Sequence, residues 1–228
     1  MAQAVPPDST VISVLVCDDH RLLTDTLTTV IEHDGSLRLI TPPVHTSEEA
    51  VRLTQEQRPD VVLMDIEFRG SMSGIDATRE IKNFSPSTMV VIMTAHEDDR
   101  LLVEAVEAGA SGFLRKTEGV DTVLGAVKAA AAGEILIDRA ELARLLPHVA
   151  RERDVQRDAE LLLGHLTDRE REILQLLGDG MRNEDIAVRL FISPQTVQTH
   201  VRNILTKLGV HSKLEAVVFA LRHGAVTV

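Results

Sequence analysis

The sequence predicts two domains of different fold class: a doubly wound α/β domain with a parallel sheet over residues 10–132 and an all-α domain of four helices over residues 165–228. In the first part, continuous β-branched runs alternate with helix-like stretches, which is typical of a parallel sheet buried on both faces. The last part holds short helices with strong capping residues. A length of 228 residues also suits two domains of modest size.

Four apolar runs in the first part are expected to be strands, at Val11–Val16, Val61–Met64, Met89–Met93 and Gly112–Leu114. Helices are expected between and after them, at His20–Glu32, Ser47–Gln57, Gly74–Asn83, Asp98–Ala108 and 121–132. Ligands of such sheets bind beyond the carboxyl ends of the strands, so the residues that follow each strand are the candidates for a site.

Five chemically matched residues follow these strand ends: Asp18 and Asp19, then Asp65, Thr94 and Lys116. Three carboxylates at one edge repel one another unless a hard cation holds them, and Mg²⁺ takes oxygen ligands of this kind. One carboxylate then becomes a nucleophile toward phosphorus, with an ammonium to balance charge and a hydroxyl to hydrogen-bond the phosphoryl group. A lone Asp after a strand is usually a cap or turn residue, but five matched residues favour chemistry.

The four helices of the second domain are expected at 168–177, Glu184–Leu190, Pro194–Leu208 and Lys213–Arg222. Their predicted capping residues are Thr167, Asn183, Ser193 and Ser212. Pro194 at the first helical position and Gly209 after the last one mark the third helix with particular clarity.

The second and third of these helices, with the short turn between them, form a helix-turn-helix. Side chains of Gln, Asn and Arg can hydrogen-bond base edges, and cations can pair with phosphates. The candidate DNA-binding residues are Gln195, Thr196, Gln198, Thr199, Arg202, Asn203 and Lys207. The residues alone leave open a four-helix interaction module with a solvated polar face.

The charge is divided unequally along the chain. Of the net −11, residues 1–132 carry −10, residues 133–164 carry −2 and residues 165–228 carry +1. The stretch from Ile186 to Leu214 holds cations and no acid. This difference predicts that the acidic first domain docks on the second. Aromatic residues make up 2%, without Trp or Tyr, which argues against a carbohydrate-stacking site, an aromatic cage or an RNA-stacking sheet.

The single cysteine, Cys17, predicts a reducing compartment, and the longest early apolar run is too short for a signal or membrane segment. We therefore expect a cytoplasmic protein without a membrane partner. Residues 133–164 are charged and rich in Leu and Ala, which predicts a semi-rigid helical linker, in two helices, that Pro147 breaks or kinks.

The segments VLVCDDHRLL, VVLMDI, MTAH and AGASGFLRKT resemble the receiver domain of response regulators, a flavodoxin-like fold, over residues 11–132. The resemblance implies Mg²⁺-dependent phosphorylation of Asp65 by a sensor histidine kinase. It also implies that Asp18, Asp19 and the backbone carbonyl of Glu67 join Asp65 in binding the metal. Three further roles are implied, for Thr94 as the hydroxyl switch, Phe113 as the switch aromatic and Lys116 as the phosphoryl contact.

The chain departs from the receiver pattern around the acceptor. The loop Ile66–Gly74 lacks the usual Pro and is one residue longer, and Thr117 stands where Pro commonly follows the lysine. Glu67 adds a fourth carboxylate, which we expect to slow phosphoryl entry or alter metal affinity. His96, two residues past Thr94, is expected at the rim of the phosphorylation site. The sequence leaves open whether it affects hydrolysis of the phosphoryl group.

Residues 165–224 closely resemble the LuxR-type DNA-binding domain of NarL/FixJ response regulators, as in the run NEDIAVRLFISPQTVQTHVRNILTKLGV. The resemblance makes Pro194–Leu208 the recognition helix, with Gln198, Thr199 and Arg202 facing bases. It also makes the last helix a dimerisation helix with a contact face of Ala216, Val217 and Ala220. Gln198 stands where the family often has Lys, and Arg182 where it often has Ser, so the target site is not transferable from relatives.

The resulting expectation is a homodimeric response regulator that binds double-stranded DNA and whose receiver masks the recognition helix until Asp65 is phosphorylated. It is expected to be no enzyme beyond its own phosphoryl transfer and hydrolysis. One alternative is a Mg²⁺-dependent phosphatase with an aspartyl nucleophile and Glu67 as acid. Another is a phosphorylation-independent transcription factor whose receiver is gated by a protein or ligand, which the unusual loop Glu67–Ser73 favours.

Overall fold

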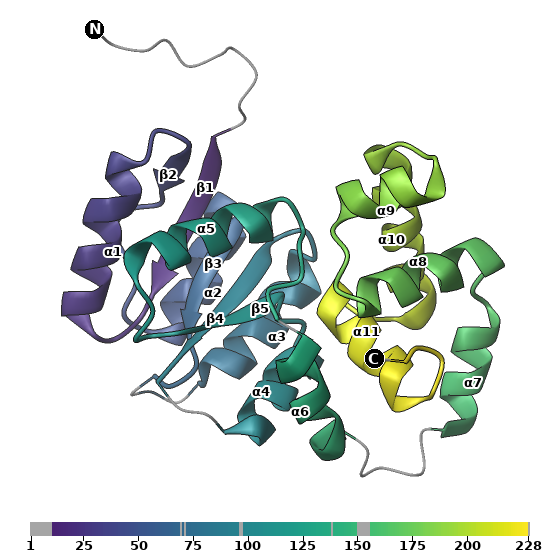
Figure 1. The fold of residues 1–228 in the computed structure, drawn as a ribbon. Helices are drawn as coiled ribbons and strands as arrows, with labels where there is room; N and C mark the ends of the chain where they lie inside the picture. Colours follow the sequence, from purple (N-terminus) through teal and green to yellow (C-terminus); the bar gives the residue numbers. More distant parts are fainter. Residues whose placement is uncertain are drawn as a thin grey trace, which may run out of the picture.

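The computed structural model describes residues 11–227 apart from residues 69, 71, 96, 97, 138 and 150–155. The expectation for His96 therefore lies outside the described residues. Two domains lie side by side, a sheet-based domain at the N-terminal end and a helical domain at the C-terminal end (Figure 1). Within the described part of the chain, no helix has the length and apolar character needed to cross a membrane.

The first domain is built on a five-stranded sheet of order β2-β1-β3-β4-β5 in which all paired strands are parallel. The strands are β1 (Ile12–Cys17), β2 (Leu37–Leu39), β3 (Val61–Asp65), β4 (Met89–Thr94) and β5 (Gly112–Arg115). The predicted fold class is confirmed. The sequence pattern missed β2, because this strand has only three residues and an exposed Arg38 at its centre.

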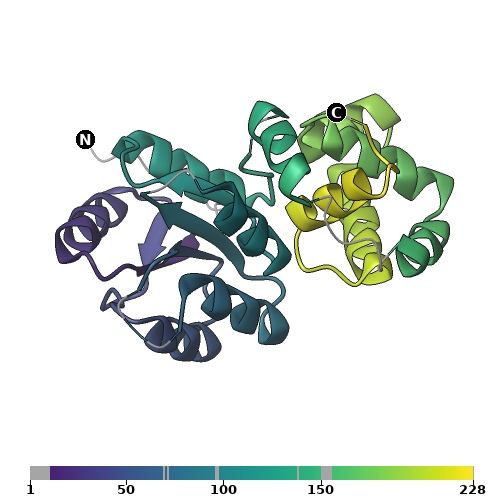
Figure 2. The ribbon, with the colours of Figure 1, turned by 90° about the horizontal axis from the view of Figure 1, so that it is seen from below.

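Helices cover both faces of the sheet, as the view from below in Figure 2 shows. They are α1 (Arg21–His33), α2 (Ser47–Gln57), α3 (Gly74–Phe84), α4 (Asp99–Glu107) and α5 (Val120–Ala131). In β1, Val14 and Val16 join a core with α1 and α5, whereas Leu15 and Cys17 join a core with α2, α3 and α4. This alternation explains why the strands read as unbroken apolar runs, since both of their faces are buried.

The second domain consists of α8 (Asp168–Gly178), α9 (Asn183–Leu190), α10 (Pro194–Leu208) and α11 (Lys213–Arg222). The predicted capping box of Thr167 and Glu170 is present, and Ser193 accepts a hydrogen bond from the backbone of Thr196 to begin α10. The prediction that Asn183 caps α9 is wrong. Asn183 is the first residue of the helix, and its Oδ1 accepts a hydrogen bond from Lys213 Nζ at 2.7 Å.

Two linker helices, α6 (Arg139–Val149) and α7 (Gln156–Gly164), connect the domains. Pro147 does not break α6 at its own position, because the helix continues to Val149. The apolar side of α6, with Leu142 and Leu145, belongs to one hydrophobic core shared with α4 and with α8 to α11 (Figure 1). The two domains are therefore joined by continuous apolar packing.

Polar contacts add to this interface. Arg222 of α11 pairs with Glu107 of α4 at 2.5 Å, and Arg144 of α6 pairs with Asp99 of α4 at 3.3 Å. Docking of the two domains agrees with the expectation from the charge division. Most of the interface is apolar, however, so complementary charge is only part of its cause.

The expected dimer face of α11 does not lie on the surface of this conformation. Ala216, Val217 and Ala220 are at most 1% exposed and belong to the protein's own shared core. The prediction of a free contact face there is wrong for this conformation, because the small side chains let α11 pack closely against α8 and Val217 lies beside Gly178.

Two largely desolvated ionisable groups, Lys82 and Glu215, lie at the same interface. Lys82 of α3 is 1% exposed and donates to the carbonyls of Pro86 at 2.7 Å and Thr88 at 3.0 Å. Glu215 of α11 accepts from the backbone N–H of His211 at 2.7 Å. Burial raises the pKa of Glu215 from 4.5 to about 7, although the backbone N–H groups and the Lys82 charge oppose the shift.

Glu215→Gln is expected to change how stability depends on pH. Because the folded-state pKa of Glu215 is raised, its charge costs stability above pH 7, and the cost disappears as pH falls through 7 toward 4.5. As the pH rises from 5 to 8, the free energy of unfolding of the variant should increase by about 2 kcal/mol relative to that of the wild type, a value discounted for partial exposure. Urea unfolding at both pH values measures this difference, and parallel pH profiles of the two proteins would contradict it.

Candidate functional site

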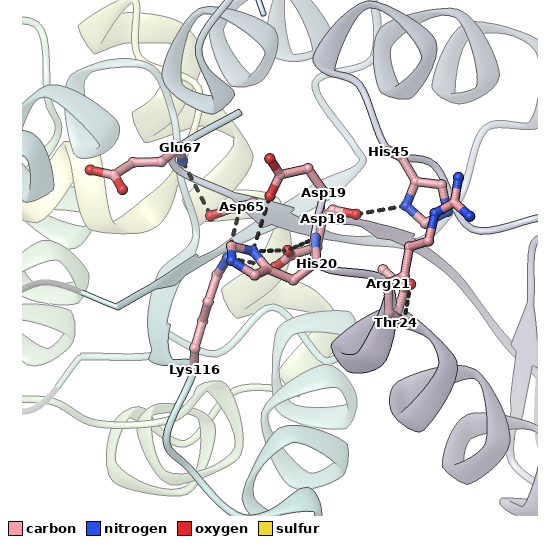
Figure 3. Close-up of polar contacts among 9 residues, drawn as sticks. All are labelled: Asp18, Asp19, His20, Arg21, Thr24, His45, Asp65, Glu67 and Lys116. Carbon is pink, nitrogen blue, oxygen red and sulfur yellow. Dashed lines mark hydrogen bonds and ion pairs between the residues drawn. The ribbon is translucent and has the colours of Figure 1, made fainter. Parts of the chain in front are cut away.

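The carboxyl ends of β1, β3 and β5 bring three of the predicted site residues into direct contact. Asp18 follows β1, Asp65 ends β3 and Lys116 follows β5. Lys116 Nζ lies 2.8 Å from Asp18 Oδ2 and 2.7 Å from Asp65 Oδ2, so one ammonium bridges both carboxylates (Figure 3). The two aspartate side chains are 0% and 1% exposed, and that of Lys116 is 14% exposed.

Asp19 and His20 complete the acidic cluster. The ring Nδ1 of His20 lies 3.1 Å from Asp18 Oδ1 and 3.0 Å from Asp19 Oδ1, and its backbone N–H donates to Asp18 Oδ1 at 2.8 Å. The sequence pattern alone did not point to His20, although its place directly after the acid pair is a signal for it. It also missed His45, whose Nδ1 contacts the backbone carbonyl of Asp18 at 2.8 Å and fixes this strand end (Figure 3).

Burial decides the electrostatics of the cluster. Desolvation raises the pKa of Asp65, with the Asp18 charge adding to the effect, although hydrogen bonds from Lys116 and from the Glu67 backbone oppose it. Burial also lowers the pKa of Lys116, but its hydrogen bonds to Asp18 and Asp65 outweigh this and leave its pKa raised. The site thus holds excess negative charge that a single lysine balances only in part.

The donor set suits a hard divalent cation. Ligand atoms of Asp18, Asp19, His20 and Asp65 all lie within 4.8 Å of one another. Three of these groups are carboxylates, which are the oxygen ligands that such cations prefer. The backbone N–H of Glu67 donates to Asp65 Oδ1 at 3.2 Å. The exposed side chain of Glu67 extends away from the cluster in Figure 3, so its carboxylate does not lie among the candidate ligands.

The two predicted switch residues lie on the neighbouring strands. Thr94 ends β4, one residue beyond the Met93 that pairs with Asp65, and is 5% exposed. Its carbonyl accepts a hydrogen bond from the Lys116 backbone at 2.9 Å. Phe113 on β5 is half-buried and packs against both the shared interdomain core and the core formed with α2, α3 and α4.

The polar face of α10 forms a second candidate site. Val197, Val201, Ile204 and Leu208 are buried. All but one of the predicted DNA-binding residues are exposed, namely Gln195, Thr196, Gln198, Thr199, Arg202 and Asn203. The exception is Lys207, which is half-buried and pairs with the buried Glu170 at 2.6 Å.

A cavity of about 800 Å³ separates α10 from the first domain. Gln198 and Arg202 line it on the helix side, whereas Met89, Ser111 and Glu134 line it on the opposite side. Two of the three residues expected to contact bases therefore point into the cavity that faces the first domain.

Comparison with known proteins gives consistent matches over both domains. Residues 14–128 match the model of the response regulator receiver domain, and residues 164–220 match the model of bacterial regulatory proteins of the luxR family. The uncharacterized transcriptional regulatory protein YxjL of Bacillus subtilis (strain 168) is 35% identical over 215 residues, covering 94% of this chain and 97% of that protein. The transcriptional regulatory protein LiaR of the same organism is 35% identical over 214 residues, covering 93% and 98%.

A solved structure gives a similar result for part of the chain. The crystal structure of a LuxR-family two-component response regulator from Aurantimonas sp. SI85-9A1 has a TM-score of 0.55 and 26% identity. The match covers 61% of this chain and 98% of that one.

Lys116→Met is expected to destabilise the protein strongly in the absence of divalent cations. The change leaves two buried carboxylates without their shared cation, and breaking a buried pair in this way costs about 3 to 5 kcal/mol. Lys128→Met is the matched control, because Lys128 pairs with Asp34 at 2.6 Å while 44% exposed, and such a pair contributes about 1 kcal/mol or less. Urea unfolding in EDTA measures both, and equal losses would contradict the role assigned to Lys116.

Proposed function

Because the chain belongs to the family of transcriptional response regulators that join a receiver domain to a luxR-type domain, we propose that phosphorylation of Asp65 controls its binding to DNA. The observation that carries this proposal is the bridge from Lys116 to the buried carboxylates of Asp18 and Asp65. The proposed boundaries are 10–132 for the receiver, 133–164 for the linker and 165–228 for the DNA-binding domain. A cytoplasmic location is part of the same proposal.

The proposed chemistry begins with an oxygen of the Asp65 carboxylate. This oxygen attacks the phosphorus of a phosphohistidine on a sensor kinase, a P–O bond forms, and the P–N bond breaks with its electron pair leaving on the histidine. Asp18, Asp19 and Asp65, with the backbone carbonyl of Glu67, would hold Mg²⁺. When bound, this ion neutralises charge on the phosphoryl oxygens.

The remaining steps belong to the chain's own side chains. Lys116 already lies against the acceptor carboxylate, so a small movement brings its ammonium to a phosphoryl oxygen. Thr94 at the end of β4 is placed to donate its hydroxyl to another. Phe113, on the strand β5 that directly precedes Lys116, would change its packing when Lys116 moves. Beyond this self-phosphorylation and slow hydrolysis we propose no enzymatic activity.

The proposed output is sequence-specific binding of double-stranded DNA by α10, with Gln198, Thr199 and Arg202 as the base-facing residues. The cavity between α10 and the receiver supports a masked state before phosphorylation, since two of these residues front the receiver. Homodimerisation on DNA is part of the same proposal.

The unusual loop after the acceptor favours a second candidate, a phosphorylation-independent regulator whose receiver is gated by a protein or ligand. The loop runs from Glu67 to Ser73 and adds a carboxylate beside the site. Because the side chain of Glu67 extends away from Asp65, repulsion of an incoming phosphoryl group by this residue is weaker than the sequence alone indicates. The phosphatase alternative gains no support, since the same orientation removes Glu67 as a general acid.

Asp65→Asn should abolish phosphorylation. With Mg²⁺ and a small phosphodonor such as acetyl phosphate, the wild type should gain the mass of one phosphoryl group, and chelation by EDTA should prevent this gain. Asp76→Asn, at an exposed position on α3, is the control and should still be phosphorylated. No mass gain in the wild type would favour the ligand-gated regulator instead.

Gln198→Ala should relax base preference at one position of the bound DNA sequence, with a loss of discrimination of about 1 to 3 kcal/mol. Arg171→Ala removes a cation from α8, outside the recognition face, and should leave the preference intact. Selection of duplexes from a random pool by phosphorylated protein provides the readout. An unchanged preferred sequence for Gln198→Ala would count against α10 as the reading helix.

A further inference from the structure

The start of the linker lies along the open edge of the receiver sheet. Residues 133–137, which we term the strap, follow α5 and precede α6. Leu136 forms a parallel bridge with Gly112 of β5. The backbone N–H of Phe113 donates to the carbonyl of Leu136, and that of Leu136 donates to the carbonyl of Ser111, both at 3.3 Å. The strap thus continues the sheet beyond its edge strand.

Gly112 is the residue that makes this contact possible. A Cβ atom at Gly112 would lie 2.2 Å from Leu136 Cβ, 2.8 Å from its carbonyl oxygen and 2.9 Å from its Cα. Two of these neighbours are backbone atoms, which cannot move aside as a flexible side-chain end can. Any other residue at position 112 must therefore displace either the strap or β5. β5 pairs with β4 over four residues, whereas two long hydrogen bonds join the backbone of the strap to β5 and Leu136 is only partly buried against the core, so the strap yields.

The other end of the strap is held by the DNA-binding domain. Lys213, the first residue of α11, donates its Nζ to the carbonyl of Gly133 and also to Asn183 Oδ1 at the start of α9. A single lysine therefore ties the strap to two helices of the second domain. This contact also accounts for Asn183 not capping α9.

The strap contacts β5, the strand that carries the predicted switch residue Phe113 and directly precedes Lys116. Phe113, which bonds to Leu136, lies three positions before Lys116 on the chain and packs against the interdomain core. Lys116 in turn bonds to Thr94 through its backbone and to Asp65 through its side chain. A continuous series of contacts therefore runs from Asp65 through β5 and the strap to α11 and α9.

We propose that the strap is a releasable latch: seated on β5 by Gly112, it holds the DNA-binding domain closed, and its release opens α10 to DNA. This inference rests on the proposed function. The hydrogen bonds at 3.3 Å are longer than the usual 2.9 to 3.0 Å, so a small shift of β5 is enough to break them. Phosphorylation would supply that shift by drawing Lys116 from Asp18 and Asp65 toward the phosphoryl group.

Two variants test the latch in the full chain. Gly112→Ala displaces the strap from the receiver side. Leu136→Pro removes the N–H that donates to Ser111 and acts from the strap side without changing a residue of β5. Gly125→Ala is the matched control, because a Cβ at this exposed position in α5 meets nothing within 4 Å.

Hydrogen exchange and DNA affinity are the two readouts. Without phosphorylation, both variants should lose protection of the Phe113 amide and bind a duplex of random sequence at low salt about tenfold more tightly than the wild type, a typical size for coupling between sites. Gly125→Ala should match the wild type in both. Phosphorylation by acetyl phosphate should still occur in the variants, which shows that the receiver remains folded.

Two outcomes would overturn the latch: retained protection of Phe113 in both variants, or lost protection with DNA affinity unchanged. Failure of the proposed function gives a different pattern. In that case, neither the phosphorylated wild type nor any variant binds DNA, while the exchange measurement still reports whether the strap is seated.

Discussion

Two buried carboxylates held by one ammonium are the interaction on which the site depends. Asp18 and Asp65 reach their positions because parallel strands end at the same edge of the sheet. At that edge both side chains are almost fully buried, and the ammonium of Lys116, which contacts both, offsets their mutual repulsion. The Lys116 ammonium would respond to added charge, since a phosphoryl group on Asp65 would compete with the two carboxylates for it.

The strand β5, which directly precedes Lys116, is also the strand that contacts the linker and the interdomain core. β5 lies at the open edge of the sheet, its Phe113 packs into the interdomain core, and the strap pairs with its backbone. The short strand β5 therefore connects the site at its carboxyl end with the domain contact along its edge. The apolar contact among α4, α6 and α11 contributes to docking, and the strap adds the contact that connects docking directly to β5.

The sequence predicted the fold and the meeting of Asp18, Asp65 and Lys116 at one edge of the sheet, because these follow from local patterns. Buried strands read as apolar runs, and residues after strand ends converge at one edge. Features that depend on long-range contacts were missed or misassigned. Asn183 has the chemistry of a cap but is bonded to Lys213, and Lys207 has the spacing of a recognition residue but pairs with Glu170. The small face of α11 was assigned to a second copy, whereas the chain buries it itself.

The distance between the two domains before and after phosphorylation tests the central claim most directly. Spin labels at exposed positions Asp121 on α5 and Glu184 on α9 would report it, since Cys17 is buried and its raised thiol pKa keeps it unreactive. We expect a longer and broader distance distribution when Asp65 carries a phosphoryl group, and a return to the original one on hydrolysis. An unchanged distribution in fully phosphorylated protein would show that phosphorylation does not separate the domains.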